Sequence, residues 1–528
     1  MRPVLNAVSL LLLAGVTTIV LFTALCSPLK DDIAWLLYVA HRWLAGRELY
    51  VDVIEVNPPL IIWLSAIPLT VAGWLQTAPQ FVVMPTFAAI ALGCAWWSAC
   101  LLRPIGGLFA ARMPVFAVIG GVLLIIPAAD LGQREHLLAA AFLPYLIVFA
   151  RMLAPEPDGA RPTVITSLVA GVLAALGCAL KPQYGLVFVA LEGVALSHRI
   201  RPWRAAPLAA AVTMILYVAV VAYVCPPYLR RAVPLALALY GATDVSFQAL
   251  LLKSAPLLAA EGLAIYLWWR DRRRLADTAL LLTGMVFAAT SSVVFFIDGK
   301  DWFYHRLPAT LATLLTLILW AAATIRQRQY DAQGRCQEDG RGWRSSWGGL
   351  ALAGMVVVSF CAGAVQRLEP EVQQAVEPQA TTVARLEALI RLHHARTYIA
   401  FSEWIALGFP VVNNTGVIWA SRFDSMWALK GELWRAHIDP AASKEWPITH
   451  WVAQDFIAGC PDIAVVDTRQ GLNYISVLSA TEPSFKRVWS RYKQIVAFDG
   501  LKVYKHGKGG CIDPWVAAEG PGSGTTVR

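Results

Sequence analysis

Runs of apolar residues long enough to cross a bilayer recur through residues 1–366. The hydrocarbon core of a membrane is about 30 Å thick, so a crossing helix needs roughly 20 mostly apolar residues. We identify eleven such runs, near residues 6–28, 80–102, 113–129, 136–153, 163–180, 184–198, 204–224, 249–269, 274–297, 307–325 and 347–365. The sequence therefore predicts a polytopic α-helical membrane protein with about eleven transmembrane helices.

The distribution of charge separates a membrane part from a soluble part. Residues 1–366 contain 27 Lys and Arg and 19 Asp and Glu, whereas the shorter segment 367–528 contains 17 and 16. The second segment has the charge density of an ordinary soluble domain. We therefore predict a membrane domain over 1–366 and a soluble α/β domain over 367–528, ending in a disordered tail at 515–528. No Lys/Arg stripe lies in the soluble segment, so the net charge of +9 does not indicate a nucleic-acid partner.

The apolar segment 58–75 decides the orientation. If it lies along the membrane surface instead of crossing, one side receives 17 basic and six acidic loop residues, and the other side receives ten of each. Basic residues gather in the cytoplasmic loops of membrane proteins. We therefore expect a cytoplasmic N-terminus, a first outer loop at 29–79 that contains the non-crossing segment, and an outer location for 367–528. The first apolar run has no small-residue cleavage site, so we expect a retained helix.

Polar residues that are costly beside lipid gather on the outer side in this topology. They are Lys30, Asp31, Asp32, His41, Arg42, Arg47, Glu48, Asp52, Glu55, Asn57, Asp130, Arg134, Glu135, His136, Lys181, Arg230, Arg231, Asp298, Lys300, Asp301, Tyr304, His305 and Arg306. Ionisable groups at membrane depth are candidates for function, although ordinary solvation explains any single loop charge equally well. The pair Asp31-Asp32 directly follows a membrane helix, where desolvation and like-charge repulsion would raise its proton affinity, as suits a general base.

The first outer loop resembles that of a known family. The acid pair is followed by Ala45-Gly46 and then by Glu55-Val56-Asn57-Pro58-Pro59-Leu60. This order resembles the first outer loop of the GT-C membrane glycosyltransferases, most closely the lipid A aminoarabinose transferases and the protein O-mannosyltransferases. In those families an acidic pair opens the loop, and a Lys-Pro-Pro-Leu-like motif begins a juxtamembrane helix that does not cross. Here Asn57 stands where a lysine is common.

Three later motifs resemble the same families in the same order. Asp130, at the outer end of a span, resembles the second acidic position, although its surroundings depart from the usual acid-Pro pattern. Lys181-Pro182 resembles a Lys-Gly or Lys-Pro element. The segment Lys300-Asp301-Trp302-Phe303-Tyr304-His305-Arg306-Leu307-Pro308 resembles the motif in which a basic residue precedes Tyr-His-x-x-Pro. The resemblance covers roughly residues 1–325 and implies a GT-C-like fold.

The resemblance also implies a reaction. A sugar would pass with inversion from a polyprenyl-phosphate donor to a glycan, lipid or protein acceptor on the outer side, without metal or with weak metal assistance. Asp31 and Asp32 would be the catalytic residues, one of them the base. The donor phosphate would contact cations and hydrogen-bond donors that stabilise its developing charge, namely Lys181, Lys300, Tyr304, His305, Arg306 and Arg134. The remaining substrate-binding candidates are Glu55, Asn57, Asp130 and His136.

Several alternatives stay open at this point. A divalent metal could be held where Asp31, Asp32, Glu55, Asp130, His136 and His305 converge, although no Cys/His spacing of a dedicated site is present. An aromatic belt at the membrane boundary explains Tyr304 and His305 without phosphate.

A transporter or flippase of a lipid-linked glycan would need polar groups at mid-membrane and internal repeat symmetry. Glu192 and Glu261 could form a proton path in such a protein, but we favour snorkelling or pairing with a neighbouring helix. A non-catalytic envelope-assembly subunit is the third function. The Ala/Leu/Arg-rich composition favours a bacterial inner membrane with a periplasmic soluble domain, although a eukaryotic endoplasmic reticulum would give the same sidedness.

The soluble segment shows the pattern of a small domain with a mixed sheet. We predict a linker at 367–380, a helix at 381–395, and buried strands at 397–401 and 462–466. The sequence Asp499-Gly500, between strand formers, predicts a tight hairpin. Polar and aromatic stretches at 413–416 and 421–427 are candidates for acceptor binding or ordinary loops. Cys460 and Cys511 are the only cysteines of this segment, and an oxidising outer compartment would allow them to pair.

Overall fold

The computed structural model describes residues 2–154, 161–275, 278–332, 342–439 and 445–507. The contacts between residues divide the chain into two compact units. The first unit comprises Met1–Ala24, Met84–Val220 and Val245–Glu371, and the second comprises Leu25–Val83, Val221–Asp244 and Val372–Arg528. The predicted first outer loop is therefore grouped with most of the predicted soluble segment.

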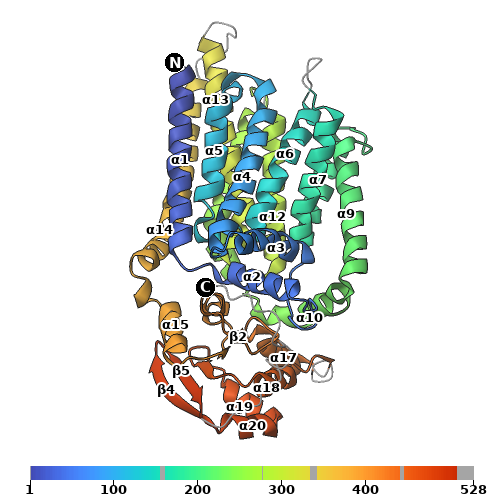
Figure 1. Ribbon diagram of the computed structural model, residues 1–528. Coiled ribbons are helices and arrows are strands. Elements are labelled where there is room, and N and C mark those ends of the chain that lie inside the picture. The colour runs from blue at the N-terminus through green and yellow to red at the C-terminus, as the bar shows by residue number, and fades with distance from the viewer. Residues whose placement is uncertain (1, 155–160, 276–277, 333–341, 440–444, 508–528) are drawn as a thin grey trace. The chain divides into compact units, whose positions relative to one another are not determined.

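The first unit is a bundle of helices that run side by side (Figure 1). Its helices are α1 (Arg2–Cys26), α4 (Gln80–Leu102), α5 (Arg112–Ile125), α6 (Arg134–Leu153), α7 (Val164–Leu180), α8 (Gly185–Ser197), α9 (Ala205–Val224), α11 (Phe247–Asp271), α12 (Thr278–Asp298), α13 (Phe303–Ala332) and α14 (Gly342–Val376). Each of the eleven predicted spans coincides with one of them. In the described part of the chain, eight helices are long and apolar enough to cross a membrane, judged by length and composition. The other three, α5, α7 and α8, have 14, 17 and 13 residues.

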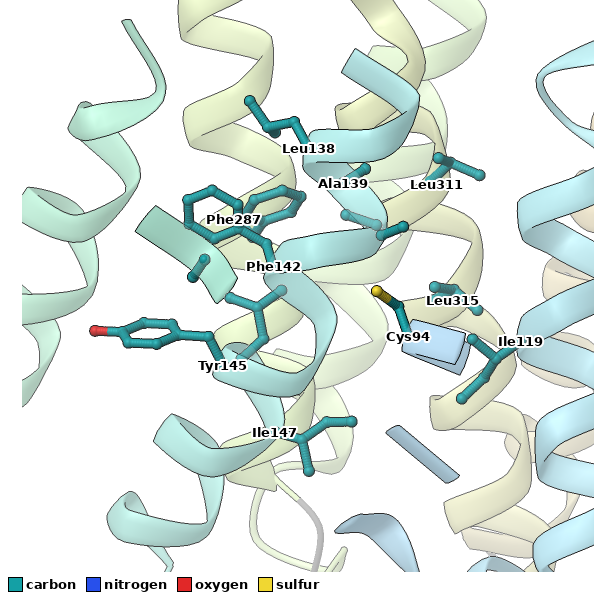
Figure 2. Packing of buried hydrophobic residues seen from close by; sticks show 14 of the residues in the cluster. Cys94, Ile119, Leu138, Ala139, Phe142, Tyr145, Ile147, Phe287, Leu311 and Leu315 are labelled. Atoms are coloured by element: carbon teal, nitrogen blue, oxygen red, sulfur yellow. The ribbon is translucent and has the colours of Figure 1, made fainter. Parts of the chain in front are cut away.

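The middle of the bundle is packed with aromatic and aliphatic side chains from α6, α12 and α13. Phe142 and Phe287 lie against each other (Figure 2), and their ring centroids are 5.3 Å apart. α6 is buried on nearly all sides, and Leu138 and Tyr145 have no exposed surface. From Leu137 to Ala150 α6 is apolar on all sides, as is typical of a helix inside a bundle.

Small residues let neighbouring helices of the bundle approach closely. A Cβ atom built on Gly171 of α7 would lie 2.2 Å from the carbonyl oxygen of Ala206 in α9. Small residues are favoured at helix contacts in membranes, because packing rather than the hydrophobic effect drives helix association there.

Glu192 and Glu261, two acidic residues inside predicted spans, are paired. Glu192 of α8 forms an ion pair with Arg204, the residue before α9. Glu261 of α11 accepts a hydrogen bond from the Ser292 hydroxyl of α12 at 2.6 Å. The prediction of pairing between neighbouring helices is therefore confirmed for both residues.

The second unit contains a five-stranded mixed sheet with the strand order β2-β1-β3-β5-β4. The strands are β1 (Thr397–Phe401), β2 (Ile418–Trp419), β3 (Ile463–Asp467), β4 (Tyr492–Phe498) and β5 (Leu501–His506). β1 is parallel to β2 and to β3, whereas β5 is antiparallel to β3 and β4. The helices of this unit are α2 (Asp31–Leu44), α3 (Pro59–Trp74), α10 (Val233–Leu239), α15 (Thr382–Leu392), α16 (Val411–Thr415), α17 (Trp427–Ile438), α18 (Ile448–Gly459), α19 (Tyr474–Thr481) and α20 (Pro483–Trp489).

Most local predictions for the soluble segment hold. The mixed sheet, the two buried strands and the hairpin are confirmed, and Asp499 and Gly500 have φ values of 50° and 74°, as a primed turn requires. The predicted linker is wrong in its first part, because α14 continues to Val376 with Pro370 inside it. The residues around Pro370 are mostly good helix formers, and their combined propensity outweighs one proline.

The close contact of α7 with α9 gives a first prediction. We expect Gly171→Ala to lower the free energy of unfolding by about 1–3 kcal/mol, because the added methyl group overpacks a backbone contact. Gly193→Ala in α8 is the matched control, since a Cβ there meets nothing within 4 Å. Thermal unfolding of the purified full-length protein in detergent measures both. Equal midpoints for the two variants would contradict the close approach.

Candidate functional site

Charged residues from several helix ends of the first unit meet at Lys181, directly after α7. The Lys181 Nζ lies 2.8 Å from Glu135 Oε1 and 2.6 Å from Asp298 Oδ2. Glu135 is in the first turn of α6, and Asp298 is the last residue of α12. The exposed fractions of the Lys181, Glu135 and Asp298 side chains are 11%, 0% and 9%. A buried charge is costly unless it is paired, so Lys181 compensates for two buried carboxylates.

His305 completes this group, which we call the Lys181 cluster. Its Nε2 lies 3.5 Å from Glu135 Oε1, and its Nδ1 lies 3.6 Å from Asp298 Oδ2. The rings of Tyr304 and Trp302 pack against the imidazole with centroids at 4.7 and 5.4 Å. The start of α13 therefore contributes both to the polar cluster and to an aromatic group beside it.

Two further cations act on the Lys181 cluster. Arg134 and Lys300 are buried, and their charges interact with His305. Lys181, Arg134 and Lys300 thus bring three cations to the carboxylates of Glu135 and Asp298 and to His305. Charge-assisted hydrogen bonds from Arg and Lys are the strong contacts to phosphate oxygens. The cluster therefore contains the residue types that can bind an anionic group.

Arg306 belongs to a second charged group. Its Nη2 lies 3.8 Å from Asp301 Oδ1, and its Nη1 donates to the backbone oxygen of Lys253 at 2.9 Å. The Lys253 side chain forms an ion pair with Asp301 in turn. The rings of Phe295 and Phe303 cover the guanidinium. These contacts fix the position of Arg306 at the start of α13.

Asp130 and His136 have different surroundings. Asp130 ends a short helix, Ala128–Asp130, and its charge interacts with Arg367 of α14. His136 is fully buried, with the Gly132 N–H donating to Nδ1 at 3.2 Å and Nε2 lying 2.8 Å from the carbonyl oxygen of Leu123. Both nitrogens of His136 therefore bind backbone groups, which favours a structural role over substrate binding.

In the second unit, Asp31 and Asp32 form the first turn of α2. Asp31 Oδ1 accepts a hydrogen bond from the Asp32 N–H at 3.0 Å and lies 3.8 Å from Lys30 Nζ. The Asp31 side chain is 26% exposed, so a substrate hydroxyl can reach it. The partial positive charge of a helix N-terminus stabilises negative charge in the first turn. The structure therefore provides an accessible carboxylate pair.

Glu55 and Asn57 form a hydrogen-bonded unit behind α2. The indole of Trp35 in α2 donates to Glu55 Oε2. The backbone and side-chain N–H groups of Asn57 donate to Glu55 Oε1 at 2.7 and 2.6 Å. The Tyr50 hydroxyl donates to the backbone oxygen of Asn57 at 2.7 Å. These bonds join α2 to the segment that leads into α3.

Residues of the C-terminal segment are bonded to this loop. The backbone N–H of Ile54 donates to the carbonyl oxygen of Arg422 at 2.7 Å, and the side chain of Asn413 donates to the carbonyl oxygen of Ala34 at 3.0 Å. The Phe409 ring packs edge-on against Trp35 with centroids 4.9 Å apart. The stretches around 413 and 421–427 therefore lie against the loop that carries the acid pair.

Asp424 adds a carboxyl group to this loop. Its Oδ1 accepts hydrogen bonds from the Ser425 N–H at 2.6 Å and the Trp427 indole at 2.8 Å. Removal from water raises the pKa of Asp424 to about 8, and the negative charges of Glu55 and Asp32 add to the shift. The carboxyl group is therefore mostly protonated at pH 7 and can donate a hydrogen bond.

Three of these carboxyl residues were not among the predicted site residues. The sequence could have indicated Glu135 and Asp298, because both lie in predicted outer turns, as Lys181 does. A lysine that is buried there needs carboxylates beside it. Asp424 lies in a stretch considered for acceptor binding, but nothing in its local sequence indicates that it lies near Glu55. Only the pairing of distant segments brings these two carboxyl groups together.

Metal and disulfide sites complete the description. Within the described ranges, no group of three His, Cys, Asp or Glu side chains is arranged to hold a metal ion. Cys460 is disulfide-bonded. Its predicted partner Cys511 lies outside the described residues, as does the predicted disordered tail 515–528, so that pairing stays a prediction.

Comparisons with known proteins identify the fold. No protein-family model matches the sequence, and no curated protein matches it. ArnT from Cupriavidus metallidurans bound to undecaprenyl phosphate matches with a TM-score of 0.52 and 13% identity, over 94% of this chain and 97% of that chain. The apo state of ArnT matches with a TM-score of 0.50 and 14% identity, over the same shares of the two chains. AglB from Archaeoglobus fulgidus, in complex with an inhibitory peptide and a dolichol-phosphate, matches with a TM-score of 0.44 and 11% identity, over 95% of this chain and 74% of that chain.

ArnT and AglB are GT-C membrane glycosyltransferases, and ArnT is a lipid A aminoarabinose transferase. The chain has the ArnT fold over nearly its whole length. The GT-C-like fold implied by the sequence motifs is therefore confirmed.

The buried ion pairs of Lys181 predict that removing its charge strongly destabilises the fold. We expect Lys181→Met to lower the free energy of unfolding by about 3–5 kcal/mol, because two buried carboxylates lose their closest cation. Adding Asp298→Asn should recover part of the loss. Lys253→Met is the control, because the Lys253 side chain is 57% exposed and its ion pair is worth about 1 kcal/mol or less. Thermal unfolding in detergent distinguishes these outcomes, and equal losses for Lys181→Met and Lys253→Met would contradict the assignment.

The raised pKa of Asp424 predicts how the stability of the fold changes with pH. Between about pH 4 and pH 8 the folded protein holds a proton on Asp424 that the unfolded chain releases, so this group makes stability fall as the pH rises through that window. Asp424→Asn removes this dependence. We expect the unfolding midpoint of Asp424→Asn, measured relative to the wild type, to be higher at pH 8.5 than at pH 5. A difference that stays constant with pH would contradict the raised pKa.

Proposed function

We propose that this protein is a membrane glycosyltransferase that moves a sugar from a polyprenyl-phosphate donor to an acceptor on the outer side of a bacterial inner membrane. The observation that carries the proposal is the ArnT fold over nearly the whole chain, together with a carboxylate pair in the first outer loop and a cluster in the bundle that contains cations. The N-terminus would be cytoplasmic, and the C-terminal segment periplasmic.

The donor phosphate would bind at the Lys181 cluster. Lys300 and Arg134 supply positive charge there, and Tyr304 and His305 supply hydrogen-bond donors. When the glycosidic bond breaks, negative charge grows on the leaving phosphate, and preorganised cations in a water-poor site stabilise it. Lys181 is engaged by two carboxylates, so its main contribution would be to hold the ends of α6, α7 and α12 in position. Arg306 would add charge from its separate group.

The acceptor would be activated in the second unit. Asp31 or Asp32 would take the proton of the acceptor hydroxyl while its oxygen attacks the anomeric carbon, and the phosphate would leave from the opposite face with inversion. Asp424, protonated at neutral pH, can donate a hydrogen bond to an acceptor oxygen, and Glu55 can accept one. A single displacement needs only one base, so the two aspartates would have different roles.

The test uses cells that lack the chromosomal copy and express variants at equal level. We expect the wild type to add one sugar unit to a surface glycan or glycolipid, measured by mass spectrometry. Asp31→Asn and Asp32→Asn should lower this addition, and loss of the base should cost about 100-fold or more. The matched control is Glu48→Gln, an exposed acid of the same loop, which should leave the glycan unchanged.

Two outcomes would overturn the proposal. One is full glycan addition by both aspartate variants, which would leave a non-catalytic assembly role. The other is an equal loss in the Glu48→Gln control, which would indicate a general effect of charge in the loop.

A further inference from the structure

The second unit contains a cavity of about 210 Å³ that the proposed reaction leaves unused. Its wall includes Tyr38 and Arg42 of α2, Arg231 of the short π-helix Tyr228–Ala232, and Trp419 of β2. β2 is the edge strand of the sheet, and the residues that follow it also line the cavity. We call this space the Arg231 cavity. Three segments that are far apart in the sequence therefore build one binding-sized space.

One side of the Arg231 cavity is rigid. Arg422 Nε and Nη2 donate to Asp455 Oδ1 at 3.1 and 2.7 Å, and the Arg422 N–H donates to Asp455 Oδ2 at 2.9 Å. Two-pronged Arg–carboxylate pairs fix both side chains in one plane. Gly459 also lines the cavity, and a Cβ there would lie 2.7 Å from the Ala420 side chain. Backbone packing and the Arg422–Asp455 pair thus hold this wall in place.

The lining combines the groups that recognise a sugar ring. Ser421, Arg422 and Asp455 offer hydrogen-bond donors and acceptors, and the half-buried Tyr38 adds an aromatic side chain. A lipid tail would strip water from these charged groups without replacing their hydrogen bonds. The volume lies below the range of about 300–1,000 Å³ usual for drug-sized ligands, which suits one sugar residue.

The charges of the lining define the ligand further. Arg422 is paired with Asp455, so the cation that would bind a ligand is Arg231, and Asp52 is the other carboxylate of the lining. The two carboxylates disfavour a dense polyanion, and Arg231 favours a single negative group. Arg231 is exposed, so it can turn toward a ligand at little cost.

We propose that the Arg231 cavity binds one sugar residue bearing a single negative group, a carboxylate or a phosphate, as part of the glycan acceptor. This proposal rests on the proposed function, because it names the class of acceptor that the transferase would engage. Tyr38 would pack on the sugar ring, the Arg422–Asp455 pair would bind hydroxyl groups, and Arg231 would bind the negative group.

The test measures binding to the full-length protein in detergent, without donor lipid, by ligand-observed NMR titration. The probes are glucuronate, glucose 6-phosphate, glucose and inorganic phosphate. We expect glucuronate or glucose 6-phosphate to bind at least tenfold more tightly than glucose or inorganic phosphate, and the tighter of the two identifies the negative group. Arg231→Gln should weaken that binding about tenfold, the value of one charge-assisted hydrogen bond.

Arg230→Gln is the matched control, because Arg230 is an equally exposed neighbour that does not line the cavity. It should leave binding unchanged. Equal weakening by both arginine variants, equal binding of inorganic phosphate, or no binding of either charged sugar would overturn the proposal. Asp31→Asn should bind the charged sugar normally, so failure of the transferase proposal and failure of this site give different results.

Discussion

The cost of burying charge in an apolar bundle governs the first unit. Lys181 lies between Glu135 and Asp298 with little exposure to water, and each of these residues sits at the end of a different helix. Removing Lys181 leaves two buried carboxylates without their closest cation in a medium of low dielectric constant, so the helix ends are coupled through the lysine. The same arrangement concentrates Arg134, Lys300 and His305 at one place. A requirement of stability thereby gathers cations and hydrogen-bonding groups at one end of these helices.

The second unit depends on a different constraint, the pairing of segments that are distant in the sequence. The predicted first outer loop, residues 29–79, packs its aromatic side chains on residues of the C-terminal segment. Trp35 and Tyr38 pack on Phe409, and the loop backbone bonds to Arg422. This pairing brings Asp424 to the acid loop and raises its pKa, because its carboxyl group loses water and faces other carboxylates. A protonated acid is thereby placed near the acid pair that would act as base.

The two units divide the chemistry of the proposed reaction. The bundle carries cations suited to the donor phosphate, and the second unit carries carboxyl groups and the Arg231 cavity suited to an acceptor. Glycosyl transfer from a lipid phosphate needs both sets, because a base must act on the nucleophile while cations stabilise the leaving group. The helix ends of the bundle hold the first set in place, and the sheet with its connected loop holds the second set.

The sequence by itself determined the helices, their approximate ends, the hairpin at Asp499-Gly500 and the fold class, because these depend on hydrophobic period, turn chemistry and short ordered motifs. It also placed Lys181 and His305 in outer turns as candidates for one site. Only the tertiary structure decided that Glu135 and Asp298 pair with Lys181, that backbone groups occupy both nitrogens of His136, and that Asp424 lies near Glu55. Desolvation and pairing of charges depend on contacts between residues far apart in the chain, and no local pattern specifies which segments will meet.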